Sequence, residues 1–427
     1  MTRLIHILSF AVLLLPRSSI VAEEAGHSGL YSLQECIATA MRNNADVLTA
    51  QNNVTASRSR SSRARSDYLP QISLQNVAFT WGSEGVLSKT TTGTALAASQ
   101  NIFDGGVREA NARSARYGVT QSAAGLTRTL QTVSFNVSKA YYEALRARHL
   151  AQVAQANVTY NEGLRDQVLA QAGVGDAAKA DILPVEAQLA NARVSLLSAQ
   201  NAVRTSLIGL QSIMGLSSQS GFRVQEVGDP PAMEIGPLDG YVTSALKSRP
   251  DVLQCRAATG AARASVTSAG IALYPRPTIS AQYQRQISGG FTTSGTQVVG
   301  GIVFDIFDGG ANRAAYREAR AGQANAEVQE QQIARDIRSQ VEQAHLNLTN
   351  ARERMTASAV SLEAANKNYL AQKERYAQGV GTTLDLLNAE VQVVTAQSDE
   401  VQARYDYYIA VAQMDYALGG QGGLNER

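Results

Sequence analysis

Few residues in this chain combine the types and the spacing that chemistry requires. The segment GVGDAA at 173–178 matches the G-x-G-x-x-A pattern of dinucleotide-binding loops. Such a loop follows a parallel strand, whereas the preceding segment RDQVLAQA is typical of a helix. The histidines His27, His149 and His345 are scattered, without a carboxylate or cysteine at the spacing of metal ligands. No nucleophile–base pattern is present either, so the sequence predicts no enzyme, no metal and no cofactor.

A second motif, Phe-Asp-Gly-Gly, occurs twice. The segments FDGGVREANARSAR (103–116) and FDGGANRAAYREAR (307–320) are identical at eight of fourteen positions, and each ends an apolar run and begins a charged, alanine-rich one. Glycine permits the backbone dihedrals of a sharp exit from a strand, and aspartate can cap the helix that follows. The motif therefore predicts two strand-to-helix junctions, in preference to binding sites, formed by Asp104, Gly105, Gly106, Asp308, Gly309 and Gly310.

The repeat extends beyond this motif. AMRNNADVL (40–48) matches ALKSRPDVL (245–253), and GVGDAAKADIL (173–183) matches GVGTTLDLL (379–387) once two residues are inserted. These matches indicate a tandem duplication. The expected units are a first repeat at 23–216, a Gly- and Pro-rich linker at 217–237, a second repeat at 238–418 and a tail at 419–427.

Residues 1–22 have the pattern of a secretory signal peptide. Arg3 precedes an apolar run from Leu4 to Leu15, and small residues lead to Ala22 before two acids. This run is shorter than the ~20 residues of a transmembrane helix. Loss of Arg3 and Arg17 with the peptide reduces the 38 basic residues to 36, which balance 36 acidic ones. The net charge therefore does not favour nucleic acid as a partner.

Two local features leave alternatives open. Cys36 and Cys255 could form a disulfide in an oxidising compartment, or stay unpaired and buried. The arginine-rich run SRSRSSRAR (57–65) lies on an expected helix, where a solvated face or contact with anionic lipid is favoured over binding of nucleic acid.

Each repeat has the pattern of a helix, two strands and two long helices. Ser32 and Glu35 form a capping box, which starts a helix that runs toward Pro70. A β-hairpin is expected at 71–103 and another at 278–307, where TISAQYQRQI alternates apolar and polar residues. Strands of about ten residues have the length of a tilted bilayer crossing.

The helices after each hairpin are expected to be long and to form coiled-coil seams. No proline interrupts 108–171, where a continuous helix would reach on the order of 90–100 Å. Small or apolar residues follow a 4-3 spacing in three seams, at 133–158, 182–203 and 387–408. Alanine at many of these positions indicates close approach of neighbouring helices.

Four membrane-length strands cannot close a barrel, and open sheet edges are not tolerated in lipid. The chain is therefore expected to assemble. Two copies would give eight strands with a filled interior, whereas three would give twelve strands and room for a channel. The long helices would continue that cylinder out of the membrane.

Together these features resemble the TolC-like outer membrane efflux family. The resemblance rests on the duplicated halves, the hairpins, the Asp-Gly-Gly exits and the helix pairs joined by Gly-Val-Gly turns. It implies an α+β membrane protein, namely a homotrimeric 12-stranded transmembrane β-barrel with four strands per chain, continued by a long α-helical coiled-coil barrel.

The same resemblance implies a passive exit duct in the outer membrane of a Gram-negative bacterium, extending into the periplasm. Its partners would be outer membrane lipid, a periplasmic adaptor (membrane fusion protein) and an inner-membrane pump of the RND, ABC or MFS type. Both efflux of small molecules and type I secretion of proteins are compatible with such a duct.

Residue roles also follow from the resemblance, at helix turns that would form the periplasmic tip. Asp181 matches the gating aspartate, Tyr376 the gating tyrosine, and Asp385 an acid that rings the constriction. The family's best-known form has an arginine at the position of Gly381 and a second acid at that of Asn388. A weaker latch and a ring of three carboxylates per trimer are therefore expected. The glycines that would contact the adaptor are Gly173, Gly175, Gly379 and Gly381.

Simpler roles stay open for these residues. Asp181 and Asp385 could be helix caps only, and the glycine turns could serve only to reverse the chain. For the whole protein, the other hypothesis is a secreted or surface-attached coiled-coil protein with a structural or adhesive role. The paired amphipathic hairpins argue against it, because a stalk does not need them.

Overall fold

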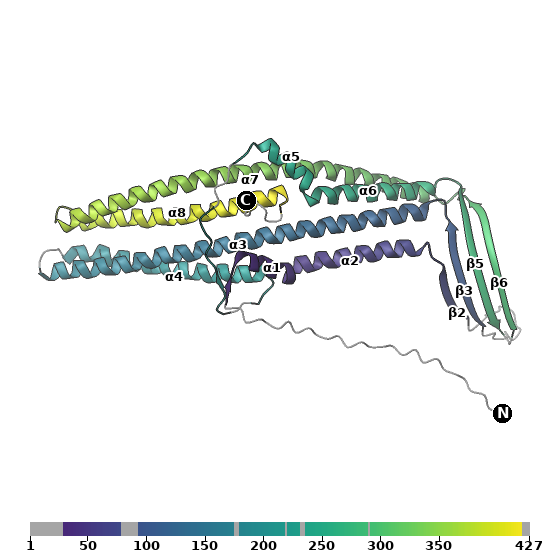
Figure 1. Ribbon diagram of the computed structural model, residues 1–427, viewed down its shortest axis with the longest axis horizontal. Coiled ribbons are helices and arrows are strands. Elements are labelled where there is room, and N and C mark those ends of the chain that lie inside the picture. Colours follow the sequence, from purple (N-terminus) through teal and green to yellow (C-terminus); the bar gives the residue numbers. More distant parts are fainter. Residues whose placement is uncertain are drawn as a thin grey trace, which may run out of the picture.

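The computed structural model describes residues 29–77, 93–174, 179–217, 220–230, 235–288 and 291–420. They form a long, narrow molecule, with a four-stranded sheet at one end and the paired ends of four long helices at the other (Figure 1). The expected signal peptide at 1–22 and residues 421–427 of the expected tail lie outside the described residues.

The same order of elements occurs in both halves of the chain. The first half contains α1 (Leu33–Asn43), α2 (Ala45–Ser66), β2 (Gln71–Val77), β3 (Gly93–Phe103), α3 (Val107–Val174), a 3-10 turn (Lys179–Asp181) and α4 (Ile182–Ile213). The second half contains α5 (Leu238–Ser248), α6 (Pro250–Ile271), β5 (Arg276–Ser288), β6 (Phe291–Val303), α7 (Ala311–Ala377) and α8 (Thr383–Leu418). Two short strands, β1 (Leu30–Tyr31) and β4 (Arg223–Val224), pair in parallel beside the helices.

The helix that begins after Ser32 is broken at Asn44, which corrects the prediction of one continuous helix. The capping box at its start is confirmed, since the Glu35 carboxylate accepts from the Ser32 amide at 2.8 Å and the Glu35 amide donates to the Ser32 hydroxyl at 3.3 Å. Asn44 is extended and starts α2, because its Oδ1 accepts from the Asp46 amide at 2.8 Å. Its Nδ2 donates to the carbonyl of Ile213 at 2.8 Å. Because the Asn44 side chain caps α2 and also bonds to the end of α4, α1 ends at this residue.

The second half is broken at the equivalent place, Arg249. A residue before proline is pushed out of the helical region, and Arg249 precedes Pro250 with φ −70° and ψ 130°. Its guanidinium, only 2% exposed, donates to Asp251 at 2.5 Å and to the carbonyl of Ala417 at 3.2 Å. These bonds of Arg249 hold the junction between α5 and α6 against the end of α8.

The long helices are present, with α3 spanning 68 residues, or about 100 Å. The expected seams are largely buried; Val133, Val137 and Ala144 are at most 3% exposed. One seam position differs, because Val391 is 44% exposed. Within the described residues, no helix has an apolar run of the length needed to cross a bilayer.

The main core lies at mid-length, where α1, α3 and α8 meet. Tyr142 stacks on Tyr408 there with ring centroids 4.9 Å apart. Cys36 is buried in this core and Cys255 is half-buried on α6, and neither forms a disulfide. Burial raises the pKa of the Cys36 thiol to about 12, with a smaller contribution from Glu35. Cys36 therefore acts as a small core residue.

The sheet has the order β2-β3-β5-β6, and every neighbouring pair is antiparallel. The second hairpin covers 276–303, which corrects the expected range 278–307. β6 ends at Val303 because its partner on β5 is Arg276, where that strand begins. Residues 304–307 therefore have no strand to pair with among the residues that the structure describes.

Candidate functional site

Strand register separates apolar from polar side chains in the sheet. Residues directly opposite each other in antiparallel strands share a face. One row across all four strands consists of polar residues on a single face, Gln71, Ser99, Gln282 and Gln297. The opposite face carries most of the large apolar side chains, Ile72, Leu74, Leu96, Ile279, Tyr283, Ile287, Val298 and Ile302, together with Arg285. Phe291, Val299 and Val303 of β6 share the face of the polar row. The alternation expected for TISAQYQRQI is confirmed, and the sheet has one face suited to lipid and one suited to water.

Each outer strand of the sheet pairs on one side only within the described residues, which leaves β2 and β6 with open edges. Every residue of β6 is exposed in the single chain. On the apolar face, Ile72 is 71% exposed and Ile302 is 75% exposed. A sheet with open edges and an uncovered apolar face is incomplete by itself.

Both Asp-Gly-Gly motifs lie between the sheet and a long helix. Asp104 Oδ1 accepts from the Gly106 amide at 3.1 Å, and its Oδ2 accepts from the Arg108 amide at 3.0 Å. Asp308 makes the same two bonds with the amides two and four residues later, at 2.8 and 2.7 Å, and these amides hold the pKa of its carboxyl below the usual range. The glycines of both motifs have φ from 68° to 99°, a range that favours glycine.

Arg108 completes the first junction. Its guanidinium donates to the carbonyl oxygens of Asp67 at 3.2 Å, Asn101 at 2.5 Å and Ile102 at 3.1 Å. It also stacks 4.0 Å above the ring of Tyr68. This side chain therefore joins the segment after α2, the end of β3 and the start of α3. The sequence patterns did not predict this role of Arg108. Its acceptors are backbone carbonyls, which every residue type has, so the identity of the neighbouring residues does not indicate them.

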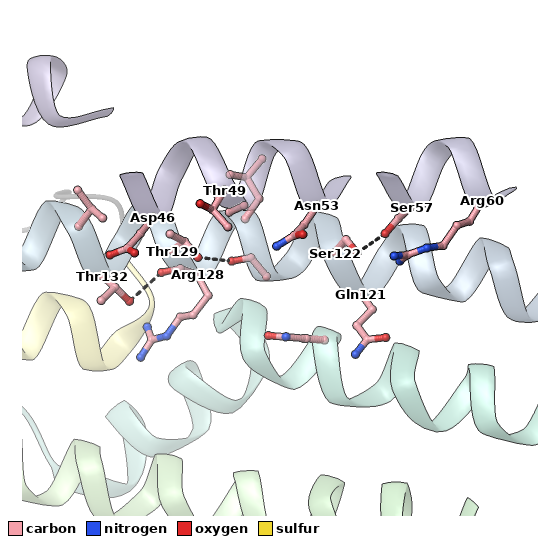
Figure 2. Close-up of a pocket in the computed structure, with 15 residues that line it drawn as sticks. Asp46, Thr49, Asn53, Ser57, Arg60, Gln121, Ser122, Arg128, Thr129 and Thr132 are labelled. Atoms are coloured by element: carbon pink, nitrogen blue, oxygen red, sulfur yellow. Dashed lines mark hydrogen bonds between the residues drawn. The ribbon is translucent and has the colours of Figure 1, made fainter. Parts of the chain in front are cut away.

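A polar groove of about 700 Å³ lies between α2, α3 and α6 (Figure 2). Asn53, Ser57 and Arg60 line it from α2, and Gln121 and Ser122 line it from α3. The hydroxyls of Ser57 and Ser122 are 2.6 Å apart and tie the two helices together across its floor.

This groove continues to the sheet. A second cavity shares Ser57 and Arg60 with it and extends to Asp67 and Asn111. A third cavity shares Asp67 and Asn111 and is lined by residues from the polar row of the sheet, Gln71, Ser99 and Gln282. The polar face of the sheet and one side of the helices therefore form a continuous polar wall.

At the far end, the two helical hairpins are held together through α3 and α7. Tyr376 Oη donates to Gln171 Oε1 at 2.8 Å. Beside this bond lies an apolar cluster from α3, α4 and α8, formed by Leu164, Val168, Val185, Leu386 and Leu387, and Tyr376 of α7 packs against it. The tyrosine singled out from the sequence therefore links the first hairpin to the second.

The acids near the tip have different surroundings. Asp385 forms a capping box with Thr382, since its Oδ2 accepts from the Thr382 hydroxyl at 2.7 Å and from the Thr382 amide at 3.2 Å. These bonds hold the pKa of the Asp385 carboxyl below its usual range. Asp181 stands at the N-cap of α4 without a side-chain capping bond. Asp385 and Asn388 are exposed and Asp181 is half-exposed.

The second glycine turn is tight. The carbonyl of Arg375 accepts from the amides of Val380 at 3.0 Å and Gly381 at 3.1 Å. A Cβ on Gly381 would lie 3.1 Å from the amide nitrogen of Tyr376, and Gly379 has φ +74°. In the first turn, Gly173 lies in α3 with open space around it, and Gly175 lies outside the described residues.

Other candidate chemistry is accounted for by structure. His149 lies 3.1 Å from the Glu226 carboxylate, and His345 lies 3.2 Å from the Gly236 carbonyl, so both help to hold the linker on the helices. His27 lies outside the described residues. Across the described ranges, no three His, Cys, Asp or Glu side chains are grouped so that they could hold a metal ion.

A comparison with known families agrees with this architecture. The model of a family described as outer membrane efflux protein matches residues 36–216 and, a second time, residues 241–420. The chain belongs to the outer membrane efflux protein family. The expected resemblance is thereby confirmed, and each matched segment contains one hairpin and one pair of long helices. The family is one of outer membrane channels and not of enzymes.

Individual relatives of this efflux-family chain cover most of its length. Outer membrane efflux protein BepC of Brucella suis is 26% identical over 393 residues, which are 91% of this chain and 84% of BepC. Alkaline protease secretion protein AprF of Pseudomonas aeruginosa is 24% identical over 300 residues, 68% of this chain and 62% of AprF. The crystal structure of the Campylobacter jejuni CmeC outer membrane channel has the same fold, with a TM-score of 0.80 and 17% identity over 91% of this chain and 86% of CmeC.

Proposed function

We propose that this chain is one subunit of a homotrimeric channel that passively conducts substrates across the outer membrane of a Gram-negative bacterium. One observation carries the proposal. The sheet has an apolar face, a polar face and two open edges, and its polar face continues into a polar wall along the helices. Closing the edges with further copies of the chain would make a cylinder with lipid outside and water inside.

Three copies fit better than two. Twelve strands leave room for a channel, whereas eight enclose only side chains. The helical end also has uncovered apolar side chains on its outer helices. Val194 and Leu197 on α4 are 63% and 67% exposed, and Leu346 and Val360 on α7, two heptads apart, are 61% and 64% exposed. Packing of α4 against α7 of the next copy would bury these seams and close a helical barrel that continues the β-barrel. The repeated order of elements supports an origin by tandem duplication.

The length of the helices suggests how the proposed channel would contact an adaptor and a pump. Helices of about 100 Å would carry the conduit from the membrane into the periplasm. There the turns near Gly173, Gly175, Gly379 and Gly381 would contact a periplasmic adaptor, and an inner-membrane pump of the RND, ABC or MFS type would supply the energy. BepC is named an efflux protein and AprF a protease secretion protein, which supports a duct for efflux or for type I secretion.

The tip would act as the gate. In this proposal, the bond between Tyr376 and Gln171 keeps the two hairpins together in the closed state. Asp181, Asp385 and Asn388 would face the constriction, where three symmetry-related carboxylates at each acidic position favour cations. The capping bonds of Asp385 are compatible with this role, since its carboxyl is exposed and ionised at neutral pH.

Replacing Tyr376 with phenylalanine is expected to raise single-channel conductance in planar bilayers. The change removes one hydrogen bond worth about 1 kcal/mol, or roughly a fivefold shift toward opening per subunit, while the ring keeps its packing. Asp181→Ala is expected to act in the same direction. Tyr316→Phe, on the same helix but near the sheet, serves as the control. Unchanged conductance for both tip variants would remove these residues from the gate.

Native mass spectrometry of the protein extracted from outer membranes tests the assembly. A trimer is the expected species. A soluble monomer or dimer would contradict the channel and favour the coiled-coil structural protein.

A further inference from the structure

Glu390 is a buried acid between the two helical hairpins. It lies on α8, two turns from the start of that helix, and is 4% exposed. Its Oε1 accepts a hydrogen bond from Nδ2 of Asn161 on α3 at 3.0 Å, and Asn161 is fully buried. The contact therefore joins the first hairpin to the second, close to the tip.

Hydrogen-bond donors and acceptors do not balance here if Glu390 is ionised. Asn161 Nδ2 carries two hydrogens, yet it lies near three acceptors, the backbone carbonyl of Asn157 at 2.9 Å, Asn157 Oδ1 at 2.7 Å and Glu390 Oε1. The backbone carbonyl determines which end of the Asn161 amide is the nitrogen. Glu390 Oε2 and Asn161 Oδ1 are buried acceptors without a partner. A single added proton on Oε2 would provide the donor that these two acceptors lack.

The surroundings of Glu390 favour its neutral form. Burial raises the pKa of Glu390 to about 8, and the bond from Asn161 acts in the opposite direction. The titratable groups that face it are Tyr160 on α3 and, beyond that ring, Tyr369 and Tyr376 on α7. Burial raises the pKa of Tyr160, so this phenol is also neutral. Within the described residues, Glu390 has no ion pair with a lysine or arginine.

We propose that Glu390 is protonated in the closed channel and donates from Oε2 to Asn161 Oδ1, and that loss of this proton to water separates α8 from α3 at the tip. The acid and the amide then form a pair of two hydrogen bonds across the hairpins. After deprotonation, a buried carboxylate without a cation is left, which is strongly unfavourable. The proposal rests on the proposed channel function and adds a pH-dependent step to its gate.

The sign of the pH effect follows from the two states of Glu390. When packed, the acid keeps its proton up to about pH 8, whereas a solvated glutamate loses it near its ordinary value of 4.5. The packed contact is therefore most stable below pH 4.5, the pKa of a solvated glutamate. Its stability falls as the pH rises from 4.5 to about 8, the pKa of packed Glu390, and is constant at higher pH. Each pH unit inside this window shifts the equilibrium toward separation by up to about tenfold per subunit.

Single-channel recording of the wild-type protein and of Glu390→Gln between pH 6 and pH 8 tests the step. The open probability of the wild-type channel is expected to rise with pH. Glutamine keeps one donor and one acceptor toward Asn161 but cannot lose a proton, so Glu390→Gln is expected to stay closed throughout. Glu374→Gln, which changes an exposed glutamate on α7, is expected to behave like wild type. A pH response of the same size in wild type and Glu390→Gln would overturn the proposal.

Infrared difference spectra of wild type against Glu390→Gln provide a readout that does not need a conducting channel. A carbonyl band of a protonated carboxyl is expected at pH 6 and should disappear on titration toward pH 9. Its absence at pH 6 would overturn the proposal even if the channel conducts. A wild-type protein that never conducts would instead count against the proposed function, while the infrared band would still decide the protonation of Glu390.

Discussion

Replacing Val298 with arginine is expected to prevent most of the protein from assembling in a membrane. Val298 lies near the middle of β6 on the apolar face of the sheet and is 66% exposed in the single chain. An arginine on the lipid face near the bilayer midplane costs about 2–4 kcal/mol. The proposed trimer would carry three such sites, so the total cost would be on the order of 6–12 kcal/mol. Urea titration of the folded fraction in lipid vesicles measures this loss.

The neighbouring residue is the matched control. Gln297 lies on the same strand but on the polar face, in the row that crosses all four strands. Gln297→Arg is expected to leave assembly intact and to make the channel less selective for cations, because in the proposed barrel the polar face lines the water-filled interior. If both variants lost assembly equally, or neither did, the assignment of the two faces would be wrong.

A second large effect is expected for Gly105→Ala at the first strand-to-helix junction. Gly105 has φ +79°, and an added Cβ would lie 2.9 Å from Cβ of Arg276 at the start of β5. The left-handed backbone costs roughly 1–2 kcal/mol, and the clash adds about 1–3 kcal/mol. Thermal or urea unfolding of the detergent-solubilised protein is expected to show a loss on the order of 3 kcal/mol per chain.

Substitution of Gly309, the equivalent glycine of the second repeat, separates the cost of the left-handed backbone from the cost of the clash. Gly309 has φ +68°, and no atom of the described residues lies within 4 Å of an added Cβ. Gly309→Ala is therefore expected to cost only the backbone contribution, roughly 1–2 kcal/mol. Equal losses for the two variants would mean that the first clash relaxes, or that a neighbouring copy packs on Gly309.

Several features of this protein could be predicted because they depend on residues close together in the chain. The capping box at Ser32, the alternation of TISAQYQRQI and the 4-3 seams all express a local period or a fixed short spacing. A period of two or of 3.5 residues places side chains on one face wherever the element lies. The two strand-to-helix exits follow the same logic, because one aspartate and two glycines meet every local requirement of the turn.

Other features depended on partners far away in the sequence. The break at Asn44 needs the carbonyl of Ile213, and the end of β6 at Val303 is set by where β5 begins. Arg108 was missed because its acceptors are backbone carbonyls brought together by folding. Glu390 was missed because a glutamate in a helix is usually solvated.

The order of residues along the chain is enough to say which side chains are apolar or polar on each strand and helix, and this pattern supports the proposal that the chain assembles in lipid with further copies of itself. Which residues meet across the two halves depends on how the helices pack in three dimensions, as where Tyr376 meets Gln171 and Glu390 meets Asn161. The two kinds of property differ in the sequence separation over which they act. Side-chain period is a property of the backbone and can be read along the chain, whereas burial and hydrogen-bond partners depend on packing between residues more than two hundred positions apart.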